Sequence, residues 1–282
     1  MKTIIVTGAS SGIGFAVCKA LLRQKYKVIG IGHSELNCKK AVDSLKELYP
    51  ASDISFLCGD LMQQTEIKRL AERLSQILID DCGGELDVLI NNAGCVRSWY
   101  TTTEDGYEQQ FALNHLAGFR LSHYLLPYLK KAGGRILFTS SNSHKMMKMR
   151  WKDPMFQQRY SPLMAYKQSK LCNVLTAFSL NERYNDDGIR AYAIDPGLVK
   201  TDIGNKQTGG LVDFIWRMRK RFGTDADIPA RTYLYLCMHS EHPDGLYYYN
   251  SNIKKHSRQV NKENAERLFA LSEQLCGIEY GD

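Results

Sequence analysis

The sequence has no long hydrophobic run. None of its 282 residues lies in a window of about 18 uncharged apolar residues, which is the length that a membrane-spanning helix needs. Residues 2–8 form a β-branched run that ends in glycine, without the apolar stretch of a signal peptide. We therefore expect a cytoplasmic chain that is soluble or, at most, contacts a membrane peripherally.

Paired cysteines are also absent. The eight cysteines are scattered singly, and none belongs to a C-x-x-C pair. This spacing argues against zinc ligation and against a redox dithiol, so we predict no metal site. Several cysteines lie in apolar runs, as Cys58 does, which favours reduced, buried thiols.

Basic residues are in excess but are not concentrated. Lys and Arg number 37 against 30 Asp and Glu, a formal net charge of +7. No dense basic stripe with interleaved aromatic residues occurs, so we expect no nucleic-acid partner. An acidic membrane surface and an anionic cofactor both stay open as reasons for the charge.

Short β-branched runs alternate with longer amphipathic segments along the whole chain. This alternation predicts parallel strands joined by helices, and the nearly continuous apolar runs suit strands buried on both faces. With no repeat and no linker, we predict an α/β fold: one doubly wound Rossmann domain, residues 1–282, with about seven parallel strands and helices on both faces. The predicted strands are Thr3–Thr7, Lys27–Ile31, Ile54–Cys58, Val88–Asn91, Arg135–Ser140, Arg190–Ile194 and Gly245–Tyr249. The predicted helices are Gly14–Gln24, Leu36–Tyr49, Gln64–Cys82, Glu104–Lys131, Ala165–Tyr184, Pro229–His239 and Lys262–Leu275.

A glycine-rich string follows the first predicted strand and opens the first helix. Its glycines permit a tight turn and let backbone amides approach a pyrophosphate, toward which the helix points its positive end. The strand–turn–helix context supports a dinucleotide site, and a glycine turn without ligand is the alternative. The candidate cofactor contacts here are Gly8, Ser10, Ser11, Gly12, Ile13 and Gly14.

The second predicted strand ends in His33 and Ser34, with no acid before Glu35. An acid at this place would accept from the ribose hydroxyls and repel a 2′-phosphate, whereas His33 and Ser34 can donate to one. NADP(H) is therefore favoured, and NAD(H) stays open. Asp60 and Leu61, after the third strand, are placed to contact the adenine, although Asp60 is also suited to capping a helix.

Four motifs in order carry a resemblance to a known family: Thr7–Gly14, Asn91–Gly94, Tyr166–Lys170 and Asp195–Gly197. Each is modest alone, but in this order and spacing the chain resembles a short-chain dehydrogenase/reductase over nearly its whole length. The resemblance implies an oxidoreductase that moves a hydride between NADP(H) and a carbonyl or alcohol carbon. A C=C reductase on the same scaffold and a non-catalytic NADP(H)-binding regulator are the alternatives.

The side chains themselves fit that chemistry. Hydride transfer to a carbonyl creates an alkoxide, so an acid or base must lie at that oxygen. Tyr166 and Lys170 are four residues apart, on one face of a helix. The ammonium of Lys170 should lower the pKa of the Tyr166 phenol, so that it exchanges a proton near neutral pH.

The resemblance assigns further roles. It implies that Ser141, with Ser140 as the fallback, donates to the substrate oxygen, and that the backbone of Asn114 positions a water for proton relay. Lys170 would also hold the nicotinamide ribose, with Tyr166 beside it, and Asn91 would brace the sheet. The remaining cofactor contacts that it implies are Asn92, Ala93, Gly94, Pro196, Gly197, Val199 and Thr201.

The spacing also points to a branch of the family. Ser141 and Tyr166 are 25 residues apart in the sequence, a longer gap than most members have. With this gap the chain resembles the retinol dehydrogenase-like and WW-domain oxidoreductase-like branch, which implies an apolar substrate. The intervening segment, residues 143–163, is polar, basic and rich in methionine, which is typical of an insertion. Its larger side chains either line the pocket or face solvent: His144, Met146, Met149, Trp151 and Met155.

A second insertion, at about residues 204–227, contains a predicted amphipathic helix, Leu211–Phe222. By resemblance it is a lid over the substrate. A surface helix and an interfacial membrane helix are the alternatives. The resemblance further implies a homo-oligomer, a dimer or tetramer, that pairs through the Glu104–Lys131 and Ala165–Tyr184 helices.

Overall fold

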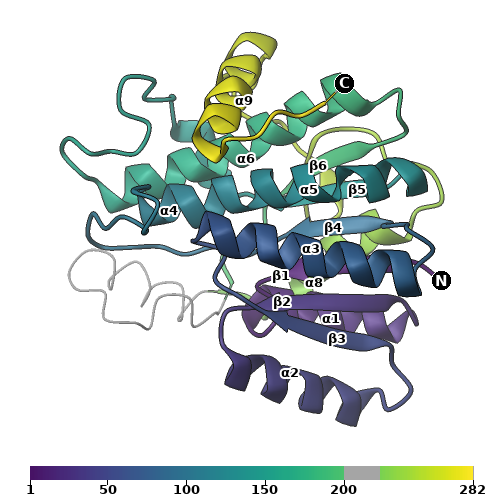
Figure 1. Cartoon of the computed structure of the whole chain (residues 1–282). Helices are drawn as coiled ribbons and strands as arrows, with labels where there is room; N and C mark the ends of the chain where they lie inside the picture. The colour runs from purple at the N-terminus through teal and green to yellow at the C-terminus, as the bar shows by residue number, and fades with distance from the viewer. Residues whose placement is uncertain (200–222, 282) are drawn as a thin grey trace.

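The computed structural model describes residues 1–199 and 223–281, and these build one eight-stranded sheet. The strand order is β3-β2-β1-β4-β5-β6-β7-β8, and every neighbouring pair is parallel except β7 and β8 (Figure 1). The strands are β1 (Thr3–Thr7), β2 (Lys27–Gly32), β3 (Ile54–Cys58), β4 (Val88–Asn91), β5 (Arg135–Thr139), β6 (Arg190–Ile194), β7 (Tyr247–Tyr249) and β8 (Asn252–Ile253).

Helices cover both faces of the sheet. Side chains alternate along each strand, so in β1 Ile5 joins one core while Ile4 and Val6 join the other. The first core packs α3 (Gln64–Asp81), α5 (Ala117–Ala132), α6 (Pro162–Tyr184) and α9 (Lys262–Cys276). The second packs α1 (Gly12–Arg23) and α8 (Asp227–Met238), with α2 (Glu35–Leu48) at its edge. The predicted doubly wound α/β fold is confirmed.

One predicted helix begins at the wrong residue, and the structure contains one strand that was not predicted. The helix predicted from Glu104 begins only at Gln109, with α4 (Gln109–Phe111), because residues before it form a turn closed by a bridge between Thr102 and Glu108. The Glu108 carboxylate then caps α4 by accepting from the backbone N–H of Phe111 at 2.7 Å. The antiparallel β8 was not predicted, because two residues carry no readable alternation.

Two short helical segments follow α4 and β5. A five-residue π-helix, η1 (Ala112–Leu116), joins α4 to α5, and a short 3-10 helix, η2 (Asn142–Met146), follows β5. The segment beyond η2 lies on α6, where Gln168 accepts from the N–H of Arg150 at 2.8 Å and donates to the carbonyl of Pro154 at 2.6 Å.

The sheet topology creates a crevice. The chain runs outward from β1 to β2 and β3 on one side and from β4 onward on the other, so the loops after β1 and β4 diverge. Such a reversal of strand order leaves a gap at the carboxyl ends of the strands, where ligands bind in open α/β sheets. No helix in the described ranges, 1–199 and 223–281, has the length and apolar character to cross a membrane. The predicted helix Leu211–Phe222 and nearly all of the second insertion lie outside those ranges.

Candidate active site

The glycine turn after β1 has the conformation that a phosphate site requires. Gly8 and Gly12 have φ of 65° and 54°, the left-handed region that favours glycine. A Cβ at Gly14 would lie 2.2 Å from the carbonyl oxygen of Gly8, so no side chain fits there. Helix α1 begins at Gly12, and the side chain of its N-cap residue, Ser11, makes no capping hydrogen bond. The first amides of α1 therefore stay available to an anion.

The loop after β4 is fastened to the glycine turn through Thr7. The Thr7 hydroxyl accepts from the N–H groups of Asn92 and Ala93, both at 2.9 Å, and the Asn92 amide donates to the Thr7 carbonyl at 3.0 Å. A Cβ on Gly8 would lie 3.0 Å from the Cα of Ala93. The two loops thus form the floor of the crevice, and Thr7, the first residue of the Thr7–Gly14 motif, holds them together.

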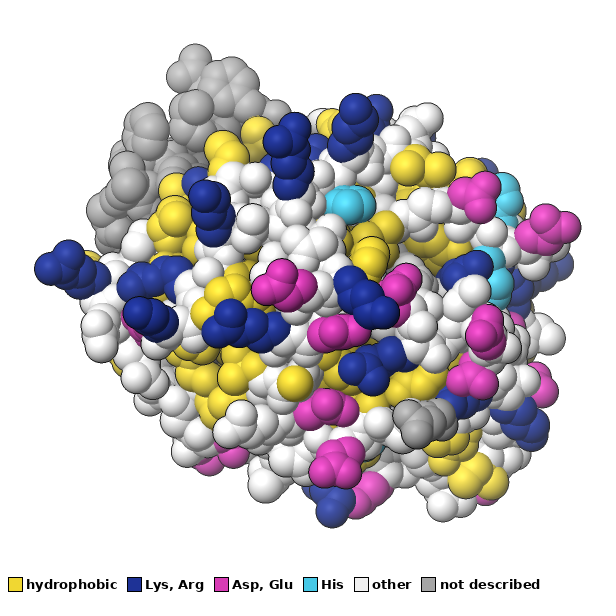
Figure 2. Space-filling view, turned by 90° about the horizontal axis from the view of Figure 1, so that it is seen from above, with side chains coloured by type: hydrophobic (Ala, Val, Ile, Leu, Met, Phe, Trp, Pro, Cys, Tyr) yellow, Lys and Arg dark blue, Asp and Glu magenta, His cyan; other side chains and the backbone are white. Residues whose placement is uncertain are grey.

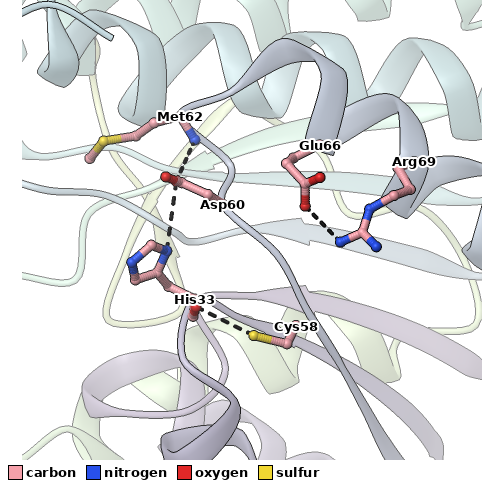
Figure 3. A network of polar contacts seen from close by, with 6 residues as sticks. All are labelled: His33, Cys58, Asp60, Met62, Glu66 and Arg69. Carbon is pink, nitrogen blue, oxygen red and sulfur yellow. Dashed lines mark hydrogen bonds and ion pairs between the residues drawn. The ribbon is translucent and has the colours of Figure 1, made fainter. Parts of the chain in front are cut away.

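The end of β2 lies against the end of β3 (Figure 3). His33 points its ring toward Asp60, with Nδ1 and Oδ1 3.7 Å apart, and the His33 side chain is 70% exposed. The same Asp60 oxygen accepts from the N–H of Met62 at 2.9 Å, so Asp60 caps a turn before α3 and not the helix itself. An exposed imidazole and a partly buried acid therefore share the predicted ribose site.

The other predicted contacts in this region differ in accessibility. Ser10 lies beside the end of β2, because a Cβ on Gly32 would be 3.1 Å from its hydroxyl. Ser34 is the N-cap residue of α2, and its side chain makes no capping hydrogen bond. Leu61 is only 7% exposed and belongs to the core, so its side chain has little surface to offer an adenine.

Tyr166 and Lys170 lie one turn apart on α6 and face a common cleft. The Lys170 ammonium is 5.6 Å from the centre of the Tyr166 ring and donates to the carbonyl of Thr139 at 3.0 Å. Lys170 is 4% exposed, so its charge is held in place by burial and by the end of β5. The cleft, a hollow of about 560 Å³ that is open to solvent, is also lined by Ile13, Asn92, Gly94, Cys95, Val96, Thr139, Ser140, Ser141, Pro196, Gly197 and Val199.

The two candidate serines have different surroundings. The Ser140 hydroxyl is buried and donates to the backbone carbonyl of Lys170 at 2.9 Å, so it is committed to fastening β5 to α6. Ser141 is partly exposed in the cleft, where its oxygen accepts from the N–H and the hydroxyl of Ser143 at 3.3 and 3.1 Å. The geometry therefore favours Ser141 as the group that can meet a substrate.

His144 supports Ser141 from behind. Its Nε2 accepts from the N–H of Ser257 at 3.2 Å, so the proton is on Nδ1, which donates to the carbonyl of Ser141 at 2.6 Å. Burial lowers the pKa of His144 to about 4. The idea that His144, Met149 and Met155 line the pocket is wrong, because all three are buried in packing contacts, whereas Met146 is 70% exposed.

Asn114 lies in the π-helix η1 and holds the loop after β4. Its Oδ1 accepts from the N–H of Cys95 at 2.7 Å, and its Nδ2 donates to the Cys95 carbonyl and to the Ser169 hydroxyl, both at 3.0 Å. Ser169 in turn donates to the carbonyl of Tyr166 at 2.8 Å. Asn114 therefore links the cofactor loop to the helix that carries Tyr166, a role that a π-helix at a functional site often serves.

The turn after β6 closes the far side of the cleft. Asp195 accepts from the N–H of Gly197 at 2.9 Å and from the Tyr247 hydroxyl at 3.1 Å. Gly197 has φ of 72°, and Pro196, Gly197 and Val199 line the cleft. The remaining predicted contact, Thr201, lies outside the described residues.

Asn91 and Cys95 complete the inner wall. Asn91 is buried and donates to the Ser122 hydroxyl at 3.1 Å, as expected of a residue that braces the sheet. Burial raises the pKa of the Cys95 thiol to about 12, which makes it a poor nucleophile. Thr139 and Cys95 also line the cleft, yet one sequence offers no pattern that would single them out.

These residues fit a dinucleotide. Glycine 14 cannot bear a side chain without blocking the turn, the amides at the start of α1 are uncapped, and the crevice runs from this turn to the cleft that Tyr166 and Lys170 line. A pyrophosphate at the glycine turn would place the other end of the molecule at that cleft.

Comparisons with known proteins agree with this arrangement. A family model for short chain dehydrogenases matches residues 2–210. Retinol dehydrogenase 12 of Mus musculus is 32% identical over 283 residues, which are 99% of this chain and 87% of that protein. Polyprenol dehydrogenase of Homo sapiens is 34% identical over 209 residues, 72% of this chain and 62% of that protein. The crystal structure of an uncharacterized protein from Mycobacterium paratuberculosis superposes with a TM-score of 0.78 at 28% identity, covering 100% of this chain and 96% of that one.

Proposed function

Because the chain belongs to the short-chain dehydrogenase family and is thus an NAD(P)-dependent oxidoreductase acting on CH–OH groups, we propose that it uses NADP(H) to interconvert an alcohol and a carbonyl on an apolar substrate. One observation carries the proposal. Tyr166, Lys170 and Ser141 line a single cleft that continues into the crevice of the glycine turn.

The protein's own groups handle the proton. Bound NADPH supplies the hydride, and the alkoxide that develops on the substrate must be protonated. The Tyr166 hydroxyl is the donor, because Tyr166 is the phenol in the cleft beside the buried ammonium of Lys170. That positive charge stabilises the phenolate left behind, and the reverse reaction returns the proton to the same oxygen.

Ser141 and Asn114 assist the reaction without forming or breaking covalent bonds. The Ser141 hydroxyl donates to the substrate oxygen and so polarises the carbonyl. The Asn114 side chain lies near Lys170, since a Cβ on Gly94 would be 3.0 Å from the Asn114 side-chain oxygen and 3.5 Å from the Lys170 ammonium. A water between the Asn114 carbonyl and Lys170 would connect Tyr166 to solvent.

The preference for NADP(H) rests on the end of β2. His33 is exposed, the hydroxyl of Ser34 is not used in capping α2, and Lys39 and Lys40 are exposed on the following helix. Asp60 opposes this preference in part, because its carboxylate lies 3.7 Å from His33. A ring N–H of His33 can donate to a 2′-phosphate, and this contact offsets the effect of that acid.

A fluorescence titration of NADPH and NADH tests the cofactor, with His33→Asp as the informative variant. We expect NADPH to bind about tenfold more tightly than NADH to the wild type, because a charge-assisted contact to phosphate is worth roughly 1.5–3 kcal/mol. His33→Asp should reverse the order. Tighter binding of NADH to the wild type would contradict the proposal.

An apolar substrate is supported by the relatives, which are named for retinol and polyprenol, and by the apolar lining of the cleft from Ile13, Val96 and Val199. A screen of aldehydes, ketones and alcohols of increasing chain length, followed by nicotinamide absorbance, tests it. We expect kcat/KM to rise with apolar length, and a preference for short polar carbonyls would contradict it.

A further inference from the structure

Two basic segments that are far apart in the sequence meet beside the catalytic cleft. Residues 142–163 contain five Lys or Arg and one acid, and residues 250–262 contain four Lys or Arg and no acid. The segments touch where the N–H of Ser257 donates to His144, and next to this contact the Arg267 guanidinium of α9 lies 4.5 Å from the centre of the Trp151 ring. Neither segment's charge is used by the reaction described above.

Both segments contribute to the wall of a hollow of about 1480 Å³ that is open to solvent, which we call the basic pocket. It is the space lined by Lys145 and Lys254 together with apolar groups such as Met146, Leu198, Ile228 and Tyr249. Ser141, Pro196 and Gly197 line both this pocket and the catalytic cleft, so the two spaces adjoin. Among the described residues that line the basic pocket, none comes from the glycine turn, 8–14, so it lies away from the pyrophosphate site.

Both pocket lysines contact Tyr247, one through its side chain and the other through its backbone. The Lys145 ammonium is 5.4 Å from the centre of the Tyr247 ring, and the backbone N–H of Lys254 donates to the Tyr247 carbonyl at 2.8 Å. Within the part of the chain that the structure describes, neither ammonium has a carboxylate within 4 Å. The acid of the pocket, Asp195, is already held by the Tyr247 hydroxyl and the Gly197 N–H, and it is 7% exposed.

Basic side chains also gather along one edge of the surface. Figure 2 shows Lys and Arg side chains, interspersed with hydrophobic ones, along the edge that borders the grey atoms, whereas basic and acidic side chains are mixed over the centre of the same view. A surface of this kind attracts anions and repels cations. Apolar lining with two ammonium groups that have no carboxylate partner among the described residues is suited to a ligand that has an apolar body and one anionic end.

We propose that the basic pocket holds an anionic group, a carboxylate or a phosphate, at the end of the substrate remote from the reacting carbon. This inference rests on the proposed function and narrows its substrate class. The reacting oxygen lies at Ser141 and Tyr166, the apolar body extends past Pro196 and Leu198, and Lys145 and Lys254 donate to the anion. The favoured substrates are therefore aldehydes or alcohols that carry a carboxylate or phosphate at the far end, rather than neutral lipids.

A matched substrate pair tests this directly. The first substrate is a long-chain aliphatic aldehyde with a carboxylate at its far end, and the second is the methyl ester of the same compound. The readout is the ratio of their kcat/KM values with NADPH, in which any general loss of activity cancels. We expect the wild type to prefer the carboxylate by about tenfold, because two charge-assisted contacts to one anion are formed.

The test variant combines Lys145→Gln with Lys254→Gln. The matched control is Lys148→Gln, because Lys148 lies in the same segment as Lys145 but is not among the residues that line the pocket. The double variant should bring the ratio to about one, and the control should keep the wild-type ratio. Added salt should lower the wild-type ratio, since both lysines are exposed. A parallel readout is the dissociation constant of an unreactive fatty acid against its methyl ester, measured on the NADPH-bound protein.

The outcomes separate this inference from the function that it rests on. Equal kcat/KM for acid and ester in the wild type, with turnover of both, overturns the anion site and leaves the oxidoreductase assignment intact. No turnover of any carbonyl, with tight binding of the fatty acid that the double variant loses, overturns the function and keeps the site. If the double variant keeps the substrate ratio but loses co-sedimentation with phosphatidylserine vesicles relative to phosphatidylcholine vesicles, the lysines bind a membrane surface, and the substrate proposal is wrong.

Discussion

Replacing Asn114 with alanine removes the link between the cofactor loop and α6. The amide makes three hydrogen bonds, two to the backbone of Cys95 and one to the hydroxyl of Ser169, and Asn114 is 4% exposed. The bond to Ser169 matters least, because the Ser169 hydroxyl still donates to the Tyr166 carbonyl. The N–H and carbonyl of Cys95 lose their partners and set the cost.

The expected loss of stability follows from those two groups. Leaving a buried donor or acceptor unsatisfied costs roughly 1–3 kcal/mol, so we expect Asn114→Ala to lower the free energy of unfolding by about 3 kcal/mol. For a domain of this size that corresponds to a fall in Tm of about 6–9 °C. Thermal unfolding followed by circular dichroism measures it, with Asn37→Ala, at an exposed position of α2, as the control.

Activity should fall as well, because Cys95 and Gly94 line the cleft and move when the loop is released. Asn114→Asp distinguishes the contacts: its carboxylate still accepts from the N–H of Cys95 but repels the Cys95 carbonyl, so we expect it to lose stability too. A Tm for Asn114→Ala within a degree or two of the wild type, with unchanged kcat/KM, would refute the role of Asn114 as a link.

Three further changes have expected outcomes. Gly14→Ala should raise the dissociation constant of NADPH by about 100-fold or more, since its Cβ would lie 2.2 Å from the Gly8 carbonyl oxygen, while Gly281→Ala, with nothing within 4 Å, should leave it unchanged in the same fluorescence titration. Burial lowers the pKa of His144 to about 4, so the unfolded chain binds a proton that the folded chain does not as the pH falls from about 6.5 toward 4. The free energy of unfolding should therefore fall over this pH range, and His144→Asn should flatten this part of its curve against pH. Parallel curves for the variant and the wild type would contradict this prediction. Arg135→Met should cost about 3–5 kcal/mol in urea unfolding, because the buried guanidinium donates to three backbone carbonyls at the end of α8 and beyond it; a cost below about 1 kcal/mol would contradict this.

The strands were predictable because each is a short apolar run whose two faces are both covered. Ile4, Ile5 and Val6 illustrate this, since consecutive side chains enter opposite cores and all must be apolar. The start of α4 was placed too early because the turn signal was overlooked. Asp105 and Gly106 form a dipeptide that is typical of turns, and Gly106 has φ of 82°. The local bridge between Thr102 and Glu108 then closes these residues into a loop.

The candidate site divides in the same way. Some site residues could be predicted because their signal is local. Gly8 and Gly14 are required by the backbone of one turn, and Tyr166 and Lys170 are four residues apart on one helix. Other roles depend on which strands become neighbours. Thr7, Thr139 and Asn114 form hydrogen bonds that hold separate loops and helices of the site together. The basic pocket depends on it even more, because Lys145 and Lys254 meet only after β7 joins the sheet beside β6.

The role of Tyr166 as the proton donor is tested by comparing Tyr166→Phe with the wild type, in NADPH binding and in turnover of a carbonyl substrate. We expect Tyr166→Phe to fold and to bind NADPH with an unchanged dissociation constant. Its kcat should fall by about 100-fold or more, the usual contribution of a positioned acid. Tyr49→Phe, at the end of α2, should match the wild type in both. A Tyr166→Phe protein that binds NADPH and retains the wild-type kcat would contradict the account.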